Sequence, residues 1–342
     1  MKPASWPRGE PLSERLLWLD PATGAMDDRA VRELPQLLTR GDLLIVNDAA
    51  TLPASFRVTT PGGPAELRLA GRTATGTFRA VLLGAGDWHQ LTTERPAPPP
   101  VAAGDALSLN GVAARVTTVS PLSPRLIEIA FALPETDLYP ALYRAGAPVQ
   151  YWYQEDRLAD WHVQTPYAAR PWAVEMPSAG RPLTLPLLVA LKRRGVALAS
   201  LTHAAGLSAT GDEALDRALP LPELTEIPAA TVQAVARAKA AGGRVVAIGT
   251  SVVRALEGTV HRHGALIAWR GEVTLRIGPG FVPRVVDALF TGMHDSGESH
   301  FDLLGAFAAP DQLARATAHA EAAGYLCHEF GDSTLIARRP AA

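Results

Sequence analysis

Residues 57–131 hold the feature that most restricts the fold of this chain: short segments in which apolar and polar residues alternate. Gly, Pro and Asn separate the segments, and no stretch among them has the spacing of a helix. The segments are ELRLAG, TFRAVLLG, ALSLNG, AARVTTV and RLIEIAF. Many short strands of this kind predict a small antiparallel barrel or sandwich. The run ERPAPPPVAAGD, Glu94 to Asp105, is then a stiff proline loop within the β region.

The residues on both sides of this region predict another kind of layer, in which strands and helices alternate. Apolar runs bounded by polar residues predict buried strands at 43–47, 196–203, 244–249 and 325–331. Helices are predicted at 186–194, 228–241, 250–258 and 311–324, with Pro228 in the first helical position of the second. Such alternation indicates parallel strands covered by helices. The predicted fold class is therefore an α/β main domain (residues 1–56 plus 135–342) with an inserted antiparallel β-barrel domain (residues 57–134).

Length and composition agree with two domains and exclude several classes of protein. The 342 residues exceed one ordinary domain. No segment reaches the ~18 apolar residues of a membrane span, and the N-terminus lacks the apolar core of a signal peptide, so a cytoplasmic protein without membrane contact is expected. The net charge of −2 gives the whole molecule no attraction to nucleic acid. A single cysteine, Cys327, excludes an internal disulfide, and its apolar neighbours indicate a buried structural thiol. The sequence does not fix an oligomeric state.

The stretch TGMHDSGESH, Thr291 to His300, places two histidines, an aspartate and a glutamate close together. His294 and His300 are too far apart in sequence to share a helix face as the two histidines of an HExxH zinc motif do. Two histidines and a carboxylate fit a metal site, a polar turn or a catalytic loop. The residues by themselves leave these three interpretations open.

A second group of candidates lies where the predicted strand 244–249 gives way to a helix. Thr250 and Ser251 begin this helix, whose N-terminus offers unpaired N–H groups to a polar ligand. Thr250 also fits the role of a simple N-cap. Arg254, one turn further along, is placed to pair with a carboxylate or with solvent. His203 ends the predicted strand 196–203, and ligands of α/β sheets gather at the carboxyl ends of strands.

Five segments, in order along the chain, resemble the S-adenosylmethionine:tRNA ribosyltransferase-isomerase family of queuosine biosynthesis. They are RLLWLDPATGAM (15–26), GDLLIVND (41–48), GTSVVRALE (249–257), PGFVPRVVDALFTGMH (279–294) and EFGDSTLI (329–336). The first two look like the family's N-terminal strand pair. The resemblance implies an α/β domain interrupted by a β-barrel, which agrees with the fold predicted above.

The resemblance also implies a reaction. The family moves the ribosyl part of S-adenosylmethionine onto the aminomethyl group of a 7-deazaguanine base in tRNA, releases adenine and methionine, and leaves an epoxide-bearing ring. The sulfonium acidifies the neighbouring C5′ protons and is later a leaving group. The protein must then supply a base, a donor to adenine and a pocket that excludes water. S-adenosylmethionine is implied as a substrate, and no metal is implied.

The catalytic residues implied by the resemblance lie in the two segments discussed above. His294 falls on the family's own histidine and is implied as a general base or as a contact to adenine or the sulfonium. Thr250 and Ser251 are implied to hold polar ligand groups at the start of the helix. Arg254 or Asp287 is implied to orient the ligand or neighbouring side chains.

Further residues are implied to bind the substrates. Ser178 and Gly180, in PSAGRPL, are expected to line the nucleoside pocket. Gln164 and Tyr167, in HVQTPYA, are expected to approach the acceptor. The other implied binding residues are Asn47, Asp48, His203 and Glu223.

The chain departs from the family pattern mainly on the acceptor side. The family's TRVIPARL-type stretch is ATLPASF here, so both arginines are replaced, by Ala50 and Ser55. The family motif PTAGLHF is PSAGRPL in this chain, and the family motif LHVG.GTF is LTHAAGLSA. The family motif H.MH.E is replaced by ALPLPEL, which keeps only its glutamate. Because phosphate contacts dominate affinity for nucleic acid, the lost arginines weaken the case for tRNA as a partner.

The stretch TGMHDSGESH is therefore interpreted as one inherited site histidine followed by a rewritten acidic loop. His300 stands where the family usually has leucine, and Asp295, Glu298 and Asp302 also replace family residues of other kinds. The main hypothesis is an S-adenosylmethionine-dependent transferase or isomerase with an altered acceptor. The alternatives are the tRNA ribosyltransferase-isomerase itself and a catalytically silent homologue that only binds the ligand.

Overall fold

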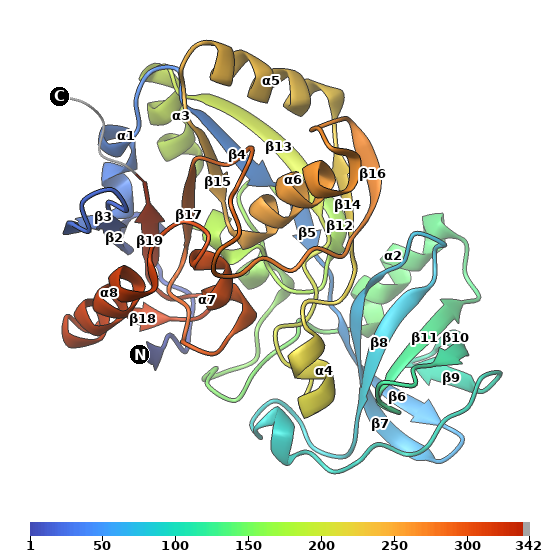
Figure 1. Cartoon of the computed structure of the whole chain (residues 1–342). Coiled ribbons are helices and arrows are strands. Elements are labelled where there is room, and N and C mark those ends of the chain that lie inside the picture. The colour runs from blue at the N-terminus through green and yellow to red at the C-terminus, as the bar shows by residue number, and fades with distance from the viewer. Residues whose placement is uncertain (338–342) are drawn as a thin grey trace.

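Within residues 1–337, which the computed structural model describes, nine strands form a mixed sheet in the order β16-β14-β13-β4-β15-β17-β19-β2-β3 (Figure 1). The central strands β13, β4, β15 and β17 run parallel. Antiparallel pairs complete the side of β14 and β16, and on the other side the parallel pair of β19 and β2 lies between the antiparallel pairs β17–β19 and β2–β3. The strands are β2 (Arg15–Leu19), β3 (Met26–Ala30), β4 (Leu43–Asn47), β13 (Ala197–His203), β14 (Glu223–Ile227), β15 (Val245–Ile248), β16 (Trp269–Val273), β17 (Ala288–Gly292) and β19 (Ser333–Ile336).

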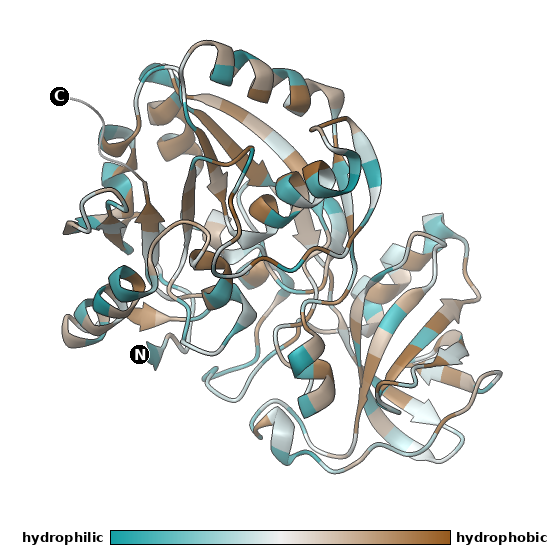
Figure 2. Cartoon of the chain, viewed as in Figure 1, coloured by the Kyte–Doolittle hydropathy of each residue, from teal (hydrophilic) through white to brown (hydrophobic). Residues whose placement is uncertain are grey.

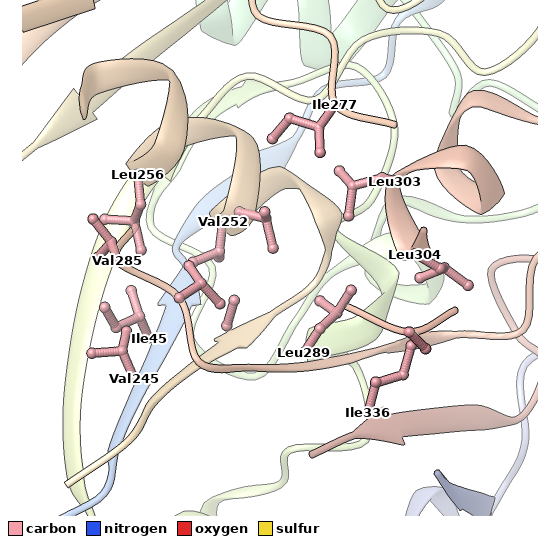
Figure 3. Packing of buried hydrophobic residues seen from close by; sticks show 14 of the residues in the cluster. Ile45, Val245, Val252, Leu256, Ile277, Val285, Leu289, Leu303, Leu304 and Ile336 are labelled. Atoms are coloured by element: carbon pink, nitrogen blue, oxygen red, sulfur yellow. The ribbon is translucent and has the colours of Figure 1, made fainter. Parts of the chain in front are cut away.

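Helices cover both faces of this sheet, which explains why the central strands β4 and β15 are almost entirely apolar. Leu43 and Ile45 of β4 join the core under α5 (Ala229–Ala240), α6 (Thr250–His263), α7 (Ser299–Leu304) and α8 (Pro310–Ala322), part of which Figure 3 shows. Leu44 and Val46 point to the other face and join the core under α1 (Leu34–Leu37) and α3 (Leu185–Arg193). A strand buried on both sides has no polar face, so LLIVN reads as an uninterrupted apolar run. Figure 2 shows β4 and β15 mostly in brown, at the hydrophobic end of its scale.

The predicted β region forms a closed antiparallel barrel beside the sheet (Figure 1). Its strands follow the order β10-β11-β8-β7-β6-β9 and enclose a separate apolar core. The strands are β6 (Ser55–Thr60), β7 (Gly63–Arg72), β8 (Phe78–Leu83), β9 (Ala106–Leu109), β10 (Val112–Val119) and β11 (Leu126–Phe131). The α/β fold with an inserted antiparallel barrel is therefore confirmed, whereas the domain boundaries at residues 57 and 134 remain a prediction.

Shorter elements join the two parts and the chain ends. β5 (Ala49–Thr51) pairs with β12 (Arg170–Ala173), and β1 (Lys2–Pro3) pairs with β18 (Leu326–Cys327). The remaining helices are α2 (Glu135–Ala145), α4 (Glu213–Ala218) and the 3-10 turns η1 (Pro11–Ser13), η2 (Val31–Glu33), η3 (Thr92–Glu94), η4 (Asp160–Val163) and η5 (Ser178–Gly180). No helix among residues 1–337 has the length and apolar character that crossing a membrane requires.

The structure corrects several expected details. Gly249, with φ of 90°, is the N-cap of α6, so Thr250 is its first helical residue and not the cap. This helix continues to His263, five residues past its predicted end, because its left-handed cap is Gly264. Pro228 is the N-cap of α5 and not its first residue.

One expected strand is also too long. The predicted strand 325–331 shortens to β18, because His328 adopts φ of 66° and turns the chain. The two N-terminal segments, 15–26 and 41–48, contribute the strands β2 and β4. Strands β15, β17 and β19 lie between them in the sheet.

Candidate functional site

A cavity of about 150 Å³ lies beyond the carboxyl ends of the parallel strands, on the side of the chain that leads to the barrel. Residues that follow β13, β15 and β17 form part of its lining, and the segment that returns from the barrel forms another part. Of the residues implied by the resemblance, six line the cavity: Ser178, Glu223, Thr250, Ser251, Arg254 and His294. This is the position at which ligands of open α/β sheets bind.

The start of α6 forms one side of the cavity. Gly249 donates its N–H to the carbonyl of Phe290 at 2.7 Å, and its positive φ turns the chain from β15 into the helix. The first turn of a helix leaves backbone N–H groups without intrahelical acceptors, and here Thr250 and Ser251 occupy that turn. Ser251 Oγ lies 3.3 Å from Asn47 Nδ2, which orients the hydroxyl at the cavity wall. This arrangement can bind polar or anionic atoms of a ligand.

A buried network beneath the cavity joins three of the implied residues. One carboxylate oxygen of Glu223 accepts a hydrogen bond from Arg254 Nη1. The same oxygen lies 2.6 Å from His203 Nε2. Its other oxygen accepts the N–H of Gly206 at 2.7 Å. Burial, and then the charge of Arg254, lower the pKa of His203 well below its usual value, so the imidazole is neutral and donates to the carboxylate. The network holds Arg254 at the wall and keeps His203 out of the cavity.

Arg254 stays charged in this network. Burial, followed by repulsion from Arg276, lowers the pKa of its guanidinium to about 9, which is still above neutral pH. The adjacent carboxylate of Glu223 compensates that buried charge. Arg254 Nε also donates to the carbonyl of Leu275 at 3.4 Å.

His294 lies at the end of β17 and faces the cavity. Its Nε2 lies 2.9 Å from Thr291 Oγ1, and its ring stacks on that of His300 with centroids 5.3 Å apart. Burial is the first cause that lowers the pKa of both rings, to about 4 for His300 and well below the usual value for His294. Both imidazoles are therefore neutral at physiological pH. A neutral imidazole beside a ligand has a free nitrogen lone pair and can accept a proton.

Glu298 completes a cluster with these two histidines. Burial, followed by repulsion from Asp295, raises the pKa of its carboxyl to about 7. The ligand atoms of His294, Glu298 and His300 lie within 4.8 Å of one another, and those of Asp295, Cys327 and His328 do so as well. Two imidazoles and one carboxylate are donors that zinc accepts. The expected absence of a metal therefore remains a prediction.

An acidic and aromatic wall, which the sequence patterns did not predict, lines the same cavity as the start of α6. Tyr151 donates to Glu175, and Tyr153 donates to Glu329 at 2.7 Å. The ring of Tyr153 also stacks on His328 with centroids 4.5 Å apart. Burial raises the pKa of both glutamates, to about 7 for Glu329. Carboxyl groups held close to aromatic rings in a cavity favour a ligand that carries a positive charge, because the cation repays their lost hydration.

Four of the implied binding residues lie behind the lining of the cavity and support it. Asn47 donates to the carbonyl of His203 at 2.8 Å. Asp48 accepts from Ser200 and Thr202 at 2.9 and 2.6 Å. Gln164 and Tyr167 also lie behind the lining and not in the cavity. Gln164 exchanges two hydrogen bonds with the backbone of Thr51, at 2.9 and 3.0 Å.

Gly180 is also behind the wall, where it allows a close contact. A Cβ at this position would lie 2.0 Å from Tyr167 Oη, so only glycine permits the aromatic ring to pack there. Both residues therefore shape the 3-10 turn η5, whose first residue, Ser178, lines the cavity.

Asp287 does not reach the cavity. It precedes β17, and its carboxylate accepts the N–H of Val245 at 2.8 Å and lies 3.5 Å from Lys239 Nζ. These contacts are at the amino ends of β15 and β17, opposite the edge where His294 lies. The expectation that Asp287 orients the ligand is therefore not supported by its position. Its side chain instead joins neighbouring elements of the sheet.

Comparison with known proteins places the chain in a family. A family model described as queuosine biosynthesis protein matches residues 3–336. An S-adenosylmethionine:tRNA ribosyltransferase-isomerase of Parvibaculum lavamentivorans is 33% identical over 333 residues, covering 95% of this chain and 92% of that protein. One of the same name from Synechococcus sp. (strain RCC307) is 35% identical over 338 residues, covering 94% and 89%.

A solved structure agrees with the fold. The crystal structure of an S-adenosylmethionine tRNA ribosyltransferase from Thermotoga maritima matches 97% of this chain and 95% of its own, with a TM-score of 0.54 and 23% identity. The family match includes both the sheet and the inserted barrel, and it runs through every segment that lines the cavity. The resemblance noted in five separate segments is thereby confirmed over the described chain, which belongs to the queuosine biosynthesis protein family.

Proposed function

We propose that this chain is an S-adenosylmethionine:tRNA ribosyltransferase-isomerase, which transfers the ribosyl part of S-adenosylmethionine to a 7-aminomethyl-7-deazaguanine base in tRNA. The observation that carries the proposal is the combination, in one cavity, of a neutral imidazole, a helix N-terminus and an acidic aromatic wall. Membership of an enzyme family whose relatives bear this name supports it.

The acidic and aromatic wall supports a cationic substrate. S-adenosylmethionine carries a sulfonium and an ammonium group, and both suit Glu175, Glu329 and the rings of Tyr151 and Tyr153. When such a cation binds, it favours the ionised form of each carboxyl, so these glutamates release protons as the complex forms. The start of α6, with Thr250 in the same cavity, then receives polar atoms of the nucleoside.

His294 is the proposed base. The sulfonium makes the C5′ protons acidic, and a neutral imidazole in the same cavity can accept one of them. The contact between His294 Nε2 and Thr291 Oγ1 fixes the ring, and the stacked ring of His300 restricts it further. Arg254 and Glu223 act as positioning residues, because their mutual contact holds the wall next to α6.

The relatives favour the tRNA enzyme over an enzyme with an altered acceptor. Proteins named as acting on tRNA share about one third of their residues with this chain over nearly its whole length. The replacement of the family's two arginines by Ala50 and Ser55 is consistent with this proposal when other cationic side chains of the protein contact the phosphates of the tRNA. The rewritten loop after His294 then changes the wall of the site without a change of substrate class.

One assay tests the proposal against its alternatives. Purified protein is incubated with S-adenosylmethionine, with and without tRNA that carries the deazaguanine base, and adenine release is followed by chromatography. We expect adenine to appear only with the modified tRNA. Release that does not depend on tRNA would support an altered acceptor instead. Absence of S-adenosylmethionine binding in a calorimetric titration would contradict both enzyme hypotheses.

A further inference from the structure

A second hollow, of about 170 Å³, adjoins the cavity described above. The two share Pro220, Arg254, Ser299 and His300 as lining residues. The hollow is otherwise bounded by the loop that follows β16, which carries Arg276 and Ile277, and by Leu303 of α7, whose packing with Ile277 belongs to the core in Figure 3. A ligand that extends out of the cavity past Arg254 therefore enters this hollow.

Arg254 has an amino group that nothing in the described chain satisfies. Its Nη1 donates to Glu223 and its Nε to the carbonyl of Leu275, but its buried Nη2 has no hydrogen-bond partner among residues 1–337. A buried donor without an acceptor costs about 1–3 kcal/mol, so such groups are usually satisfied by water or by a ligand. An acceptor oxygen placed in either hollow would supply the missing partner.

Arg276 adds a second positive charge to the same hollow. Its Nη1 donates to the carbonyl of Arg217 at 2.7 Å, which holds the exposed guanidinium at the rim. Arg276 is close enough to Arg254 for the two like charges to repel, and this repulsion contributes to the lowered pKa of Arg254. An anion between two guanidinium groups converts that repulsion into attraction, and planar guanidinium groups suit phosphate oxygens well.

We propose that the hollow between Arg254 and Arg276 holds a backbone phosphate of the RNA substrate, next to the nucleotide whose base enters the cavity. The proposal rests on the proposed function, because it takes the occupant of the cavity to be a base of RNA. In this proposal the phosphate contacts come from α6 and from the loop after β16. They do not come from the segment in which Ala50 and Ser55 replace the family's arginines. Asp302 also lines the hollow, so its carboxylate opposes the phosphate and moderates affinity.

The test uses the full chain and a stem-loop RNA that carries the deazaguanine nucleotide. Binding is measured by fluorescence anisotropy at several salt concentrations for the wild type, Arg276→Gln and Arg315→Gln. Arg315 is an exposed arginine on α8 and is the matched control. We expect Arg276→Gln to weaken binding and to reduce the slope of log affinity against log salt by about 0.7, which corresponds to one phosphate on single-stranded RNA. Arg315→Gln should leave the slope unchanged.

RNA in which one phosphate is replaced by an uncharged analogue shows which phosphate lies in the hollow. RNA with a methylphosphonate linkage on one side or the other of the deazaguanine nucleotide is compared with unmodified RNA. One of the two linkages should weaken binding to the wild type and cause a smaller loss with Arg276→Gln, since that variant has already lost one of the two arginine contacts to this phosphate and keeps only the contact from Arg254. Asp302→Asn should tighten binding of the unmodified RNA by several-fold, because it removes the opposing charge.

The outcomes separate this proposal from the proposed function. A wild-type protein without measurable affinity for the stem-loop RNA would contradict the proposed function itself. A wild type that binds the RNA, with an Arg276→Gln variant of unchanged salt slope and additive methylphosphonate effects, would overturn the phosphate site alone. An Asp302→Asn variant that binds more weakly or equally would also contradict the site.

Discussion

His294 is the residue on which the proposed chemistry most depends. Replacement by alanine removes the nitrogen that accepts the C5′ proton, and general bases of this kind contribute about 100-fold or more to a rate. We therefore expect His294→Ala to lower the rate of adenine release at least about 100-fold. His300→Ala removes only the stacked ring and should have a mild effect of a few-fold.

Thermal unfolding of both variants is the control for this prediction. Each substitution removes one half-buried ring, His294 just after β17 and His300 at the start of α7, so both variants should remain folded to a similar degree. An equal loss of turnover in the two variants, with both folded, would contradict the assignment of His294 as the base.

The glutamates of the cavity predict how ligand affinity depends on pH. The pKa values of Glu298 and Glu329 are both raised to about 7, so below that pH the two carboxyls are largely neutral. Because a cation binds best to ionised carboxylates, the affinity for S-adenosylmethionine should rise as the pH increases from about 6 to about 8. Isothermal titration calorimetry at several pH values measures this.

Substitution identifies the groups responsible. The rise in affinity should be smaller in Glu298→Gln and in Glu329→Gln, and smallest in the double variant, in which Glu175 remains as a carboxyl with a raised pKa. Glu321→Gln, which changes an exposed residue of α8, is the control and should keep the full rise. A double variant with the wild-type dependence on pH would show that other groups titrate.

The residues of the site were only partly predictable from the sequence. His294, Thr250 and Ser251 could be found because each directly follows an apolar run that forms a strand, and strand ends meet at one edge of the sheet. Glu175 and Glu329 carry no such signal, since both lie in irregular segments whose contact depends on the complete fold. The tertiary arrangement, rather than any local pattern, makes them part of the cavity.

At the level of elements, α6 anchors the long loop between β16 and β17. The carboxylate of Glu257 is fully buried and accepts the backbone N–H groups of Arg284, Val285 and Val286, each at 2.9 Å. Glu257→Ala leaves three donors without their acceptor, so we expect the free energy of unfolding to fall by about 3 kcal/mol or more. Urea denaturation followed by circular dichroism measures the change.

Glu257→Gln is the matched comparison. Its side-chain oxygen can still accept part of the N–H cluster, so the loss of stability should be clearly smaller than in the alanine variant. If Glu257→Ala changes stability by less than about 1 kcal/mol, the carboxylate does not anchor the loop. Because this loop carries Arg276, the alanine variant should also bind RNA more weakly.

Burial of side chains on both faces is what made strands easiest to locate from the sequence. Strands β4 and β15 were correctly located because burial on both faces makes the whole run apolar. The end of α6 was missed because Gly258, which looked like a terminator, lies inside the helix against Val273. A Cβ at Gly258 would lie 2.5 Å from that valine side chain, so the glycine serves close packing and not a turn.

At the scale of the whole molecule, the barrel core extends beyond the barrel strands. Leu138, Ala141 and Leu142 of α2 pack into it, and the backbone of Ser55 pairs with that of Ala147. We therefore expect a fragment of residues 53–147 to fold alone with cooperative thermal unfolding. A fragment cut at the predicted boundaries, 57–134, lacks α2 and should not.

Circular dichroism and differential scanning calorimetry of the two fragments test this expectation. Cooperative unfolding of the shorter fragment at the same temperature would show that α2 is not needed. The sequence predicted the order of the two parts because alternating strands differ so clearly from helical periodicity. It could not predict how far the barrel core reaches, since α2 follows the last barrel strand and carries no strand pattern of its own.

Strand β19 has a consequence for synthesis of the protein. It lies between β17 and β2, so within residues 1–337 the hairpin of β2 and β3 joins the sheet only through residues 333–336. On the ribosome this hairpin emerges before the other strands of the sheet, and one of its edges stays unpaired until β19 has been translated. Exposed edges of that kind attract chaperones and aggregate easily. A premature stop codon before residue 333 would therefore leave a sheet in two pieces and mark the product for degradation.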